Sequence, residues 1–125
     1  MQSYLLVALG GGIGALGRHG LGQLTLRAFG PGFPYGTMAA NIAGGLLMGL
    51  LAGWLMNKDG GQNMRLFLGV GLLGGFTTFS AFSLDAWLML ERERYGALLG
   101  YVGGSVILAI AALAFGLLIA RKVFA

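Results

Sequence analysis

The sequence predicts an all-α membrane protein with four transmembrane helices. Its composition is the first reason: of 125 residues, 57% are hydrophobic and only 10% are charged, whereas soluble domains carry about 25% charged residues. The second reason is the grouping of apolar residues into four runs, each near or above the roughly 20 residues that cross a hydrocarbon core. The runs cover about 4–26, 35–56, 66–90 and 97–120, so we expect residues 1–125 to form a single transmembrane domain.

Charge and cysteine content narrow the possible partners. The net charge is +4, but the eight lysines and arginines are spread along the chain and mostly flank the apolar runs. We therefore interpret them as membrane-flanking residues and expect no nucleic-acid partner. The chain has no cysteine, which excludes disulfides and thiolate metal sites.

The basic residues also bear on orientation in the lipid bilayer. Four spans would divide seven of them between the two sides: Lys58, Arg65, Arg121 and Lys122 against Arg27, Arg92 and Arg94. Orientation follows the lysine and arginine asymmetry of short loops, and four against three is almost no asymmetry. The sequence thus predicts insertion in both orientations and an antiparallel homodimer about a two-fold axis in the membrane plane. Chance balance in so few charges is the alternative.

The first span, about 4–26, contains two polar residues of interest. Arg18 lies well inside the run, so it either extends toward the nearer interface or lies in an aqueous vestibule where it attracts anions. His19 is interpreted as a packing residue, because no cysteine, second histidine or spaced carboxylate accompanies it. The glycines from Gly12 to Gly17 match a dinucleotide-binding pattern, but the strand and acidic residue of that motif are missing.

In the second span, about 35–56, Asn41 is the main polar residue. It shares a helical face with Thr37, Gly44 and Met48. Its amide either bonds a neighbouring helix, which is the usual role of such a residue, or donates to a dehydrated anion.

The third span, about 66–90, should be interrupted in mid-membrane. Residues 71–83 combine glycines, β-branched residues and hydroxyls, which together disfavour a continuous helix. A break leaves carbonyl oxygens unpaired, and these must be satisfied by protein, water or an ion. Carbonyl oxygens are suitable ligands for a monovalent cation such as sodium.

Aromatic and hydroxyl side chains could line an ion path through the third and fourth spans. Phe79 and Phe82 lie on one side of the helix that follows the break, and their positive ring edges can attract an anion. The alternative is that both are ordinary lipid-facing or core residues. In the fourth span, about 97–120, Tyr101 and Ser105 supply hydroxyls on one stripe.

Three motifs carry a resemblance to a known family. They are residues 10–18 (GGGIGALGR), residues 36–44 (GTMAANIAG) and residues 74–83 (GGFTTFSAFS). These segments resemble the Fluc fluoride channels of microbes, and the match covers the whole chain. The last motif is the most specific, and Asn41 lies at its expected place within the second.

The resemblance implies a fluoride-selective channel, not an enzyme, that lowers cytoplasmic fluoride by passive efflux across the cell inner membrane. It further implies an antiparallel dimer with two pores and a structural sodium ion at its centre. The main-chain carbonyls of Gly74 and Thr77 match the sodium ligands, and Arg18 matches a vestibule arginine. The pore positions are matched by Asn41, Phe79, Ser80, Phe82, Tyr101 and Ser105, and Asp85 matches an acidic position near the pore end.

Two departures from the family pattern concern the polar lining. Ala81 stands where the family commonly has threonine, and Ala109 stands where a hydroxyl is often found. Both remove hydrogen-bonding groups from the expected anion path. We therefore expect conduction to persist at a lower rate, or another hydroxyl to compensate.

Three alternatives compete with a channel. A proton-coupled small multidrug exporter also has four short spans in antiparallel pairs, but it needs a membrane carboxylate; the first span has none, and Asp85 lies late in the third. An enzyme with Ser80 or Ser83 as nucleophile would need a base, and the only histidine is His19. A purely structural membrane subunit is the remaining alternative.

Overall fold

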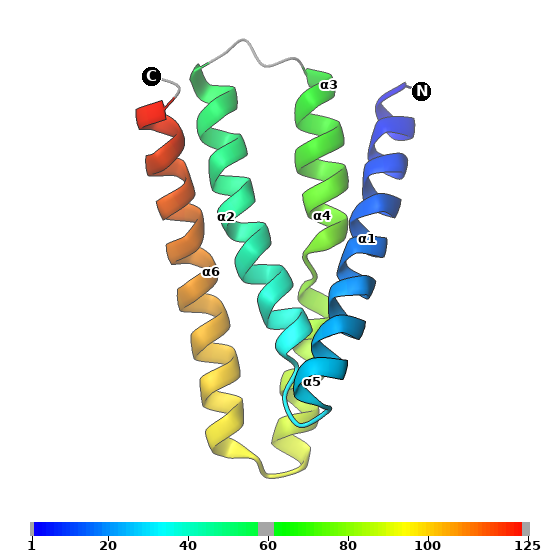
Figure 1. Cartoon of the computed structure of the whole chain (residues 1–125), viewed down its shortest axis with the longest axis vertical. Helices are drawn as coiled ribbons and strands as arrows, with labels where there is room; N and C mark the ends of the chain where they lie inside the picture. The colour runs from blue at the N-terminus through cyan, green and yellow to red at the C-terminus, as the bar shows by residue number, and fades with distance from the viewer. Residues whose placement is uncertain (1, 58–61, 124–125) are drawn as a thin grey trace.

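A computed structural model describes residues 2–57 and 62–123, and throughout these ranges the regular structure is helical. Lys58, one of the residues in the charge comparison, lies outside the described residues. The elements follow the order of the chain in Figure 1: α1 (Gln2–Phe29), α2 (Tyr35–Asn57), α3 (Gln62–Met64), the π-helix η1 (Arg65–Leu73), α4 (Gly74–Phe76), α5 (Phe79–Glu91) and α6 (Tyr95–Val123).

Three stretches are long and apolar enough to cross a membrane: Tyr35–Leu55, Gln62–Glu91 and Tyr95–Val123. They include the second, third and fourth spans expected from the sequence, apart from the last residue of the second. Helix α1 is 28 residues long, but it is not one of the three. Its interior carries Arg18 and His19, and these polar residues lower its mean hydropathy. The all-helical prediction is confirmed, whereas the fourth membrane crossing stays a prediction.

The long helices run side by side with alternating direction (Figure 1). The start of α1, the end of α2, the start of α3 and the end of α6 lie at one end of the molecule. The turns that join α1 to α2 and α5 to α6 lie at the other end. Arg92 and Arg94 belong to the second of these turns. Arg121 and Lys122 lie in the last turn of α6, so each end of the bundle carries basic residues.

Glycines allow the helices to approach closely. A Cβ atom added at Gly45 of α2 would lie 2.7 Å from the Ala109 carbonyl oxygen of α6. A Cβ atom added at Gly10 of α1 would lie 2.9 Å from the Leu72 backbone nitrogen of η1. Small residues that bring backbones together are the usual basis of helix packing in lipid, where the hydrophobic effect does not drive association.

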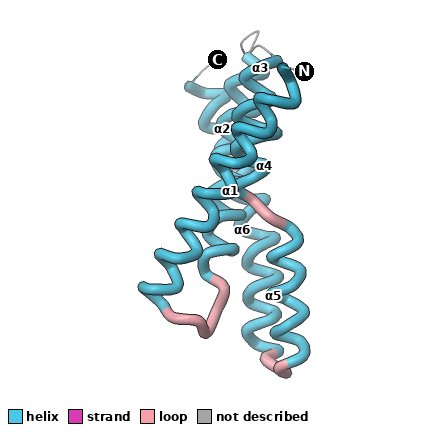
Figure 2. The backbone as a smooth tube through the Cα atoms, turned by 90° about the vertical axis from the view of Figure 1, so that its right-hand side faces the viewer, coloured by secondary structure: helices cyan, strands magenta, loops and turns pink. Residues whose placement is uncertain are grey.

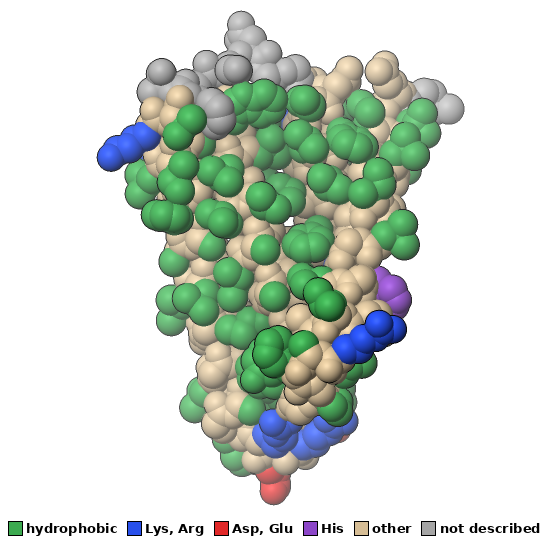
Figure 3. Space-filling view, in the orientation of Figure 1, with side chains coloured by type: hydrophobic (Ala, Val, Ile, Leu, Met, Phe, Trp, Pro, Cys, Tyr) green, Lys and Arg blue, Asp and Glu red, His purple; other side chains and the backbone are tan. Residues whose placement is uncertain are grey.

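Apolar side chains cover most of the outer surface. On the face shown in Figure 3, hydrophobic side chains extend over most of the length of the helices. Leu16 and Leu99 are 72% and 74% exposed, while the buried cluster consists of Phe82, Met89 and Tyr101. A surface with so many exposed apolar side chains is unfavourable in water and favourable in lipid.

Candidate functional site

The helical run between α2 and α6 is interrupted at two residues. Helix α4 ends at Phe76 and α5 begins at Phe79, and Figure 2 shows the connection as a short loop. Thr77 (φ −89°, ψ 155°) and Thr78 (φ −151°, ψ 128°) are both extended. The Thr77 backbone N–H and hydroxyl both donate to the Leu73 carbonyl, at 3.0 and 2.9 Å, and so close the preceding helix.

The side chain of Asn41 connects α2 to this interruption. Its Oδ1 accepts the Thr78 backbone N–H at 2.8 Å, and its Nδ2 donates to the Thr78 carbonyl at 3.1 Å. Both backbone polar groups of Thr78 are therefore paired by one amide. Of the two roles left open for Asn41, the structure shows the bond to a neighbouring segment, and one Nδ2 hydrogen remains outside this pair.

The hydroxyl of Thr78 caps the helix that follows. Thr78 is the N-cap of α5, and its Oγ1 accepts the backbone N–H of Ala81 at 3.2 Å, which is the usual capping bond. The same oxygen lies 3.2 Å from Ser80 Oγ. Ser83 Oγ donates to the Phe79 carbonyl at 2.9 Å, within the same helix.

A groove of about 360 Å³ lies beside the interruption, between α2, α5 and α6. Its polar lining comes from Asn41, Thr77, Thr78 and Ser105, and its aromatic lining from Phe79 and Phe82. The lining described by the structure contains no charged residue. Ala109, where a hydroxyl was expected from the family pattern, is also part of the lining.

Ser105, one of the residues that line this groove, carries a buried hydroxyl without a partner in the described part of the chain. The residue is only 4% exposed, and its Oγ has no hydrogen-bond partner among the described residues. Buried hydroxyls are usually paired.

Three aromatic rings form a row at one end of the groove. The ring centroids of Phe79 and Phe82 are 5.6 Å apart, and those of Phe82 and Tyr101 are 5.1 Å apart. Phe79 is 77% exposed, whereas Phe82 and Tyr101 are buried. The ring of Phe82 thus packs against that of Tyr101, and the ring of Phe79 packs against that of Phe82.

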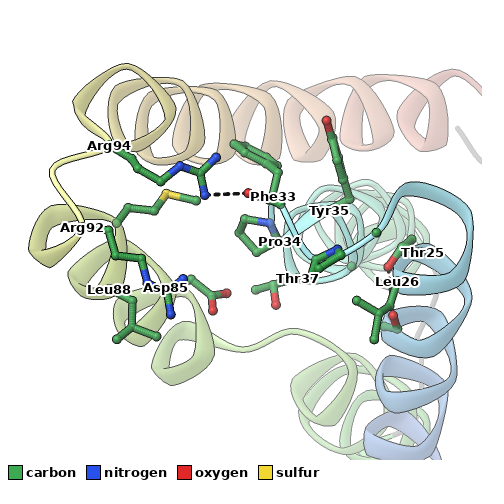
Figure 4. A pocket seen from close by; sticks show the side chains of 16 residues that line it. Thr25, Leu26, Phe33, Pro34, Tyr35, Thr37, Asp85, Leu88, Arg92 and Arg94 are labelled. Carbon is green, nitrogen blue, oxygen red and sulfur yellow. Dashed lines mark hydrogen bonds between the residues drawn. The ribbon is translucent and has the colours of Figure 1, made fainter.

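Tyr101 also contacts a residue that lines a second, more polar cavity. The Tyr101 hydroxyl donates to Asp85 Oδ2 at 3.0 Å. Asp85 lines a cavity of about 290 Å³ at the end of the bundle that holds the α1–α2 and α5–α6 turns. In Figure 4, Asp85, Arg92 and Arg94 approach this cavity from α5 and its following turn, opposite Thr25 of α1.

An arginine joins the two turns at this cavity. Arg94 Nη1 donates to the Gly32 carbonyl at 2.7 Å, the bond drawn in Figure 4. Arg18 lies elsewhere on α1, half-buried, and is not part of the lining given for either cavity. Its Nε is buried without a hydrogen-bond partner within the described chain. A vestibule role for Arg18 stays a prediction.

The structure brings together part of the site expected from the sequence. Asn41, Thr77, Phe79, Phe82 and Ser105 share the groove. Tyr101 adjoins it through Phe82, while Ser80 and Gly74 are exposed and do not belong to its described lining.

Sequence reasoning missed Thr78 and Arg94. A threonine immediately before a helical stretch is a capping signal that could have identified the first. No local pattern indicates the bond from Arg94 to a turn 62 residues away.

The described residues contain no group of three or more histidine, cysteine or acidic side chains that could hold a metal ion. His19 is exposed on α1.

The sequence is similar to those of known proteins. The family model described as CrcB-like protein, Camphor Resistance (CrcB), matches residues 5–117. A fluoride-specific ion channel of Phenylobacterium zucineum is 60% identical, over 100% of both chains. Proteins of the same name from Hyphomonas neptunium and Caulobacter vibrioides are 55% and 52% identical, again over 100% of both chains.

Proposed function

The chain belongs to the CrcB-like family, and we propose that it is a fluoride-selective channel that lowers cytoplasmic fluoride by passive efflux across the cell inner membrane. The observation that carries this proposal is the groove beside Thr77 and Thr78, which combines polar groups with aromatic rings and has no charge in its described lining. An ion must bind a conduction path well enough to enter and weakly enough to leave. Neutral donors meet that requirement better than a fixed positive charge.

The groove offers fluoride three kinds of neutral contact. The unpaired Ser105 hydroxyl can donate to it. The second Nδ2 hydrogen of Asn41 can do the same, since only one is used on Thr78. Phe79 and Phe82 supply ring edges, which carry partial positive charge. Fluoride passing the groove would exchange part of its hydration shell for these contacts.

We propose that a second copy of the chain covers the groove and completes the pore. Asn41, Thr77 and Thr78 are only partly buried in the protomer, and Phe79 is 77% exposed. Polar backbone and side-chain groups directed at lipid are costly. An antiparallel homodimer would cover them, and the near-equal basic residues at the two ends of the bundle favour insertion in both orientations.

The proposed dimer would contain α1 as a fourth crossing and the interrupted run α3–α5 as a broken third one. Helix α1 packs its glycines against η1, with Gly10 and Gly71 in close approach. A helix of this length that packs within the bundle extends through the same depth of membrane as its neighbours. Its arginine and histidine would then face protein, water or the interface, and not lipid.

A structural sodium ion fits the residues of the interruption. The Gly74 and Thr77 carbonyls lack the donors that a continuous helix would give them. Neither receives the backbone N–H of the residue four positions later, because Thr78 and Ala81 donate elsewhere. Two main-chain oxygens per chain are thus left for a cation, which would supply a central positive charge to the dimer. We propose this ion as its cofactor.

The proton-coupled exporter is not favoured. Its chemistry needs a carboxylate free to exchange protons and drug. Asp85 is instead hydrogen-bonded to Tyr101 in a cavity that it shares with Arg92 and Arg94. An enzyme is not favoured either, because the Ser83 hydroxyl donates to a main-chain carbonyl and Ser80 Oγ lies 3.2 Å from Thr78 Oγ1.

Efflux from liposomes tests the proposed function. Purified protein is reconstituted into vesicles loaded with either fluoride or chloride, and release is followed with ion-selective electrodes. We expect fast fluoride release and chloride release at the level of protein-free vesicles. Equal release of the two anions would contradict the selective channel.

A further inference from the structure

Two backbone N–H groups at the interruption donate to side chains and not along the helix. In a continuous α-helix the N–H of Thr78 would bond the Gly74 carbonyl. Likewise, the N–H of Ala81 would bond the Thr77 carbonyl. Instead, Thr78 donates to Asn41 Oδ1 at 2.8 Å, and Ala81 donates to Thr78 Oγ1 at 3.2 Å. Both carbonyls lose their helical donors to a side chain.

These two carbonyls are the ones that the proposed function assigns to sodium. We propose that Asn41 and the Thr78 hydroxyl are positioning residues for the cation: they occupy the N–H groups that would otherwise cover the Gly74 and Thr77 carbonyls. This inference rests on the proposed function. It assigns Thr78 a role that the family resemblance did not give it, and it gives Asn41 a role besides that of pore-facing amide.

The geometry of Thr77 supports this role. Its N–H and its hydroxyl both donate to the Leu73 carbonyl, so its side chain is already used. Its ψ of 155° turns its carbonyl away from the direction shared by helical carbonyls. The Thr77 carbonyl oxygen is therefore available to a ligand, while the Thr77 hydroxyl is bonded to the preceding helix.

Asn41 couples this arrangement to the anion path. It holds Thr78 by two hydrogen bonds, of 2.8 and 3.1 Å, and it also lines the groove with Phe79 and Phe82. The two hydrogen bonds link segments 37 residues apart in the chain. A displacement of Asn41 would therefore change the groove and free the Thr78 N–H to seek another acceptor, such as the Gly74 carbonyl.

The first test measures how sodium stabilises the protein in detergent. Thermal unfolding is followed over a range of sodium concentrations, with choline replacing sodium at constant ionic strength. A ligand that binds only the folded state stabilises it in proportion to the logarithm of ligand concentration over Kd. Thr78→Val keeps the side-chain shape and removes the hydroxyl, while Thr78→Ser retains the hydroxyl and is the matched control.

We expect Thr78→Val and Asn41→Ala to require about tenfold more sodium for the same stabilisation, because the ion must then displace a backbone hydrogen bond. Thr78→Ser should stay within about threefold of the parent. A general loss of packing would lower the unfolding temperature of a variant without changing its sodium dependence. Parental sodium dependence in both Thr78→Val and Asn41→Ala would overturn the proposal.

A second measurement needs no stable variant. Thr77 and Thr78 are the only adjacent threonines in the sequence, so ¹³C-carbonyl and ¹⁵N labelling of threonine gives one coupled carbonyl–nitrogen pair. In the unsubstituted protein, sodium should shift the Thr77 carbonyl resonance, and choline should not. An unmoved resonance over the sodium range that raises the unfolding temperature would also overturn the proposal.

Liposome efflux with the same preparation separates the two proposals. Fluoride-selective efflux from a protein whose stability is independent of sodium would refute the positioning role and leave the channel intact. Sodium-dependent stability that responds to Thr78→Val, together with unselective anion release, would refute the fluoride channel and leave the positioning role intact.

Discussion

Replacing Ser105 by alanine separates conduction from stability. Its hydroxyl is 4% exposed and has no partner in the described structure. An unpaired buried polar group costs about 1–3 kcal/mol. Ser105→Ala removes that group and leaves the Cβ atom in place, so we expect the stability of the protein to be unchanged or slightly higher.

The effect on conduction should have the opposite sign. If the hydroxyl donates to fluoride in the groove, its loss removes one neutral hydrogen bond from the conduction path. Such a bond is worth about 0.5–1.5 kcal/mol, and 1.4 kcal/mol corresponds to about a tenfold change in rate. We expect fluoride efflux to fall between about twofold and tenfold, with no gain in chloride release.

The assay compares Ser105→Ala with Ser83→Ala in fluoride-loaded liposomes, together with thermal unfolding in detergent. Ser83 is a suitable control because it is exposed and its hydroxyl donates to a carbonyl of its own helix. Parental efflux in Ser105→Ala would refute a role for this hydroxyl in conduction. A decrease in efflux that is matched by Ser83→Ala would attribute the effect to the general loss of a hydroxyl.

Three further substitutions have expected outcomes. Phe79→Ile should slow fluoride efflux without preventing dimer assembly in size-exclusion chromatography, because it replaces the ring edge of a side chain that is 77% exposed in the protomer; loss of the dimer would contradict this. Gly45→Ala should destabilise the protein by about 1–3 kcal/mol, since the new Cβ would lie 2.7 Å from the Ala109 carbonyl, and thermal unfolding would show whether it does. Ala81→Thr should speed fluoride efflux by restoring a hydroxyl to the anion path. An unchanged rate would count against the idea that the missing hydroxyl at position 81 slows conduction.

The helices could be predicted because their signals are local. The apolar runs gave the second, third and fourth long segments within a few residues, and the expected runs of 35–56 and 97–120 lie inside α2 and α6. The composition of residues 71–83 indicated a segment that disfavours a continuous helix, and the extended residues Thr77 and Thr78 lie within it.

The contacts of the site could not be predicted, because they join distant segments. The two bonds between Asn41 and Thr78 cross 37 residues, and the bond from Tyr101 to Asp85 crosses 16. No pattern in either segment specifies its partner. Sequence reasoning left two roles open for the Asn41 amide, and only the geometry shows which backbone groups it bonds.

The amide of Asn41 also explains how an interruption can lie inside a membrane helix. Breaking the helix at Thr77 and Thr78 releases backbone donors and acceptors that lipid cannot satisfy. Both polar groups of Thr78 are recovered by Asn41, and the Ala81 N–H is recovered by the Thr78 hydroxyl. The carbonyls of Gly74 and Thr77 still lack a helical N–H donor, and both are hydrogen-bond acceptors. The proposed cation would satisfy these oxygens from two chains at once, so the hydrogen bonds that make the interruption tolerable also leave the two acceptors that we assign to it.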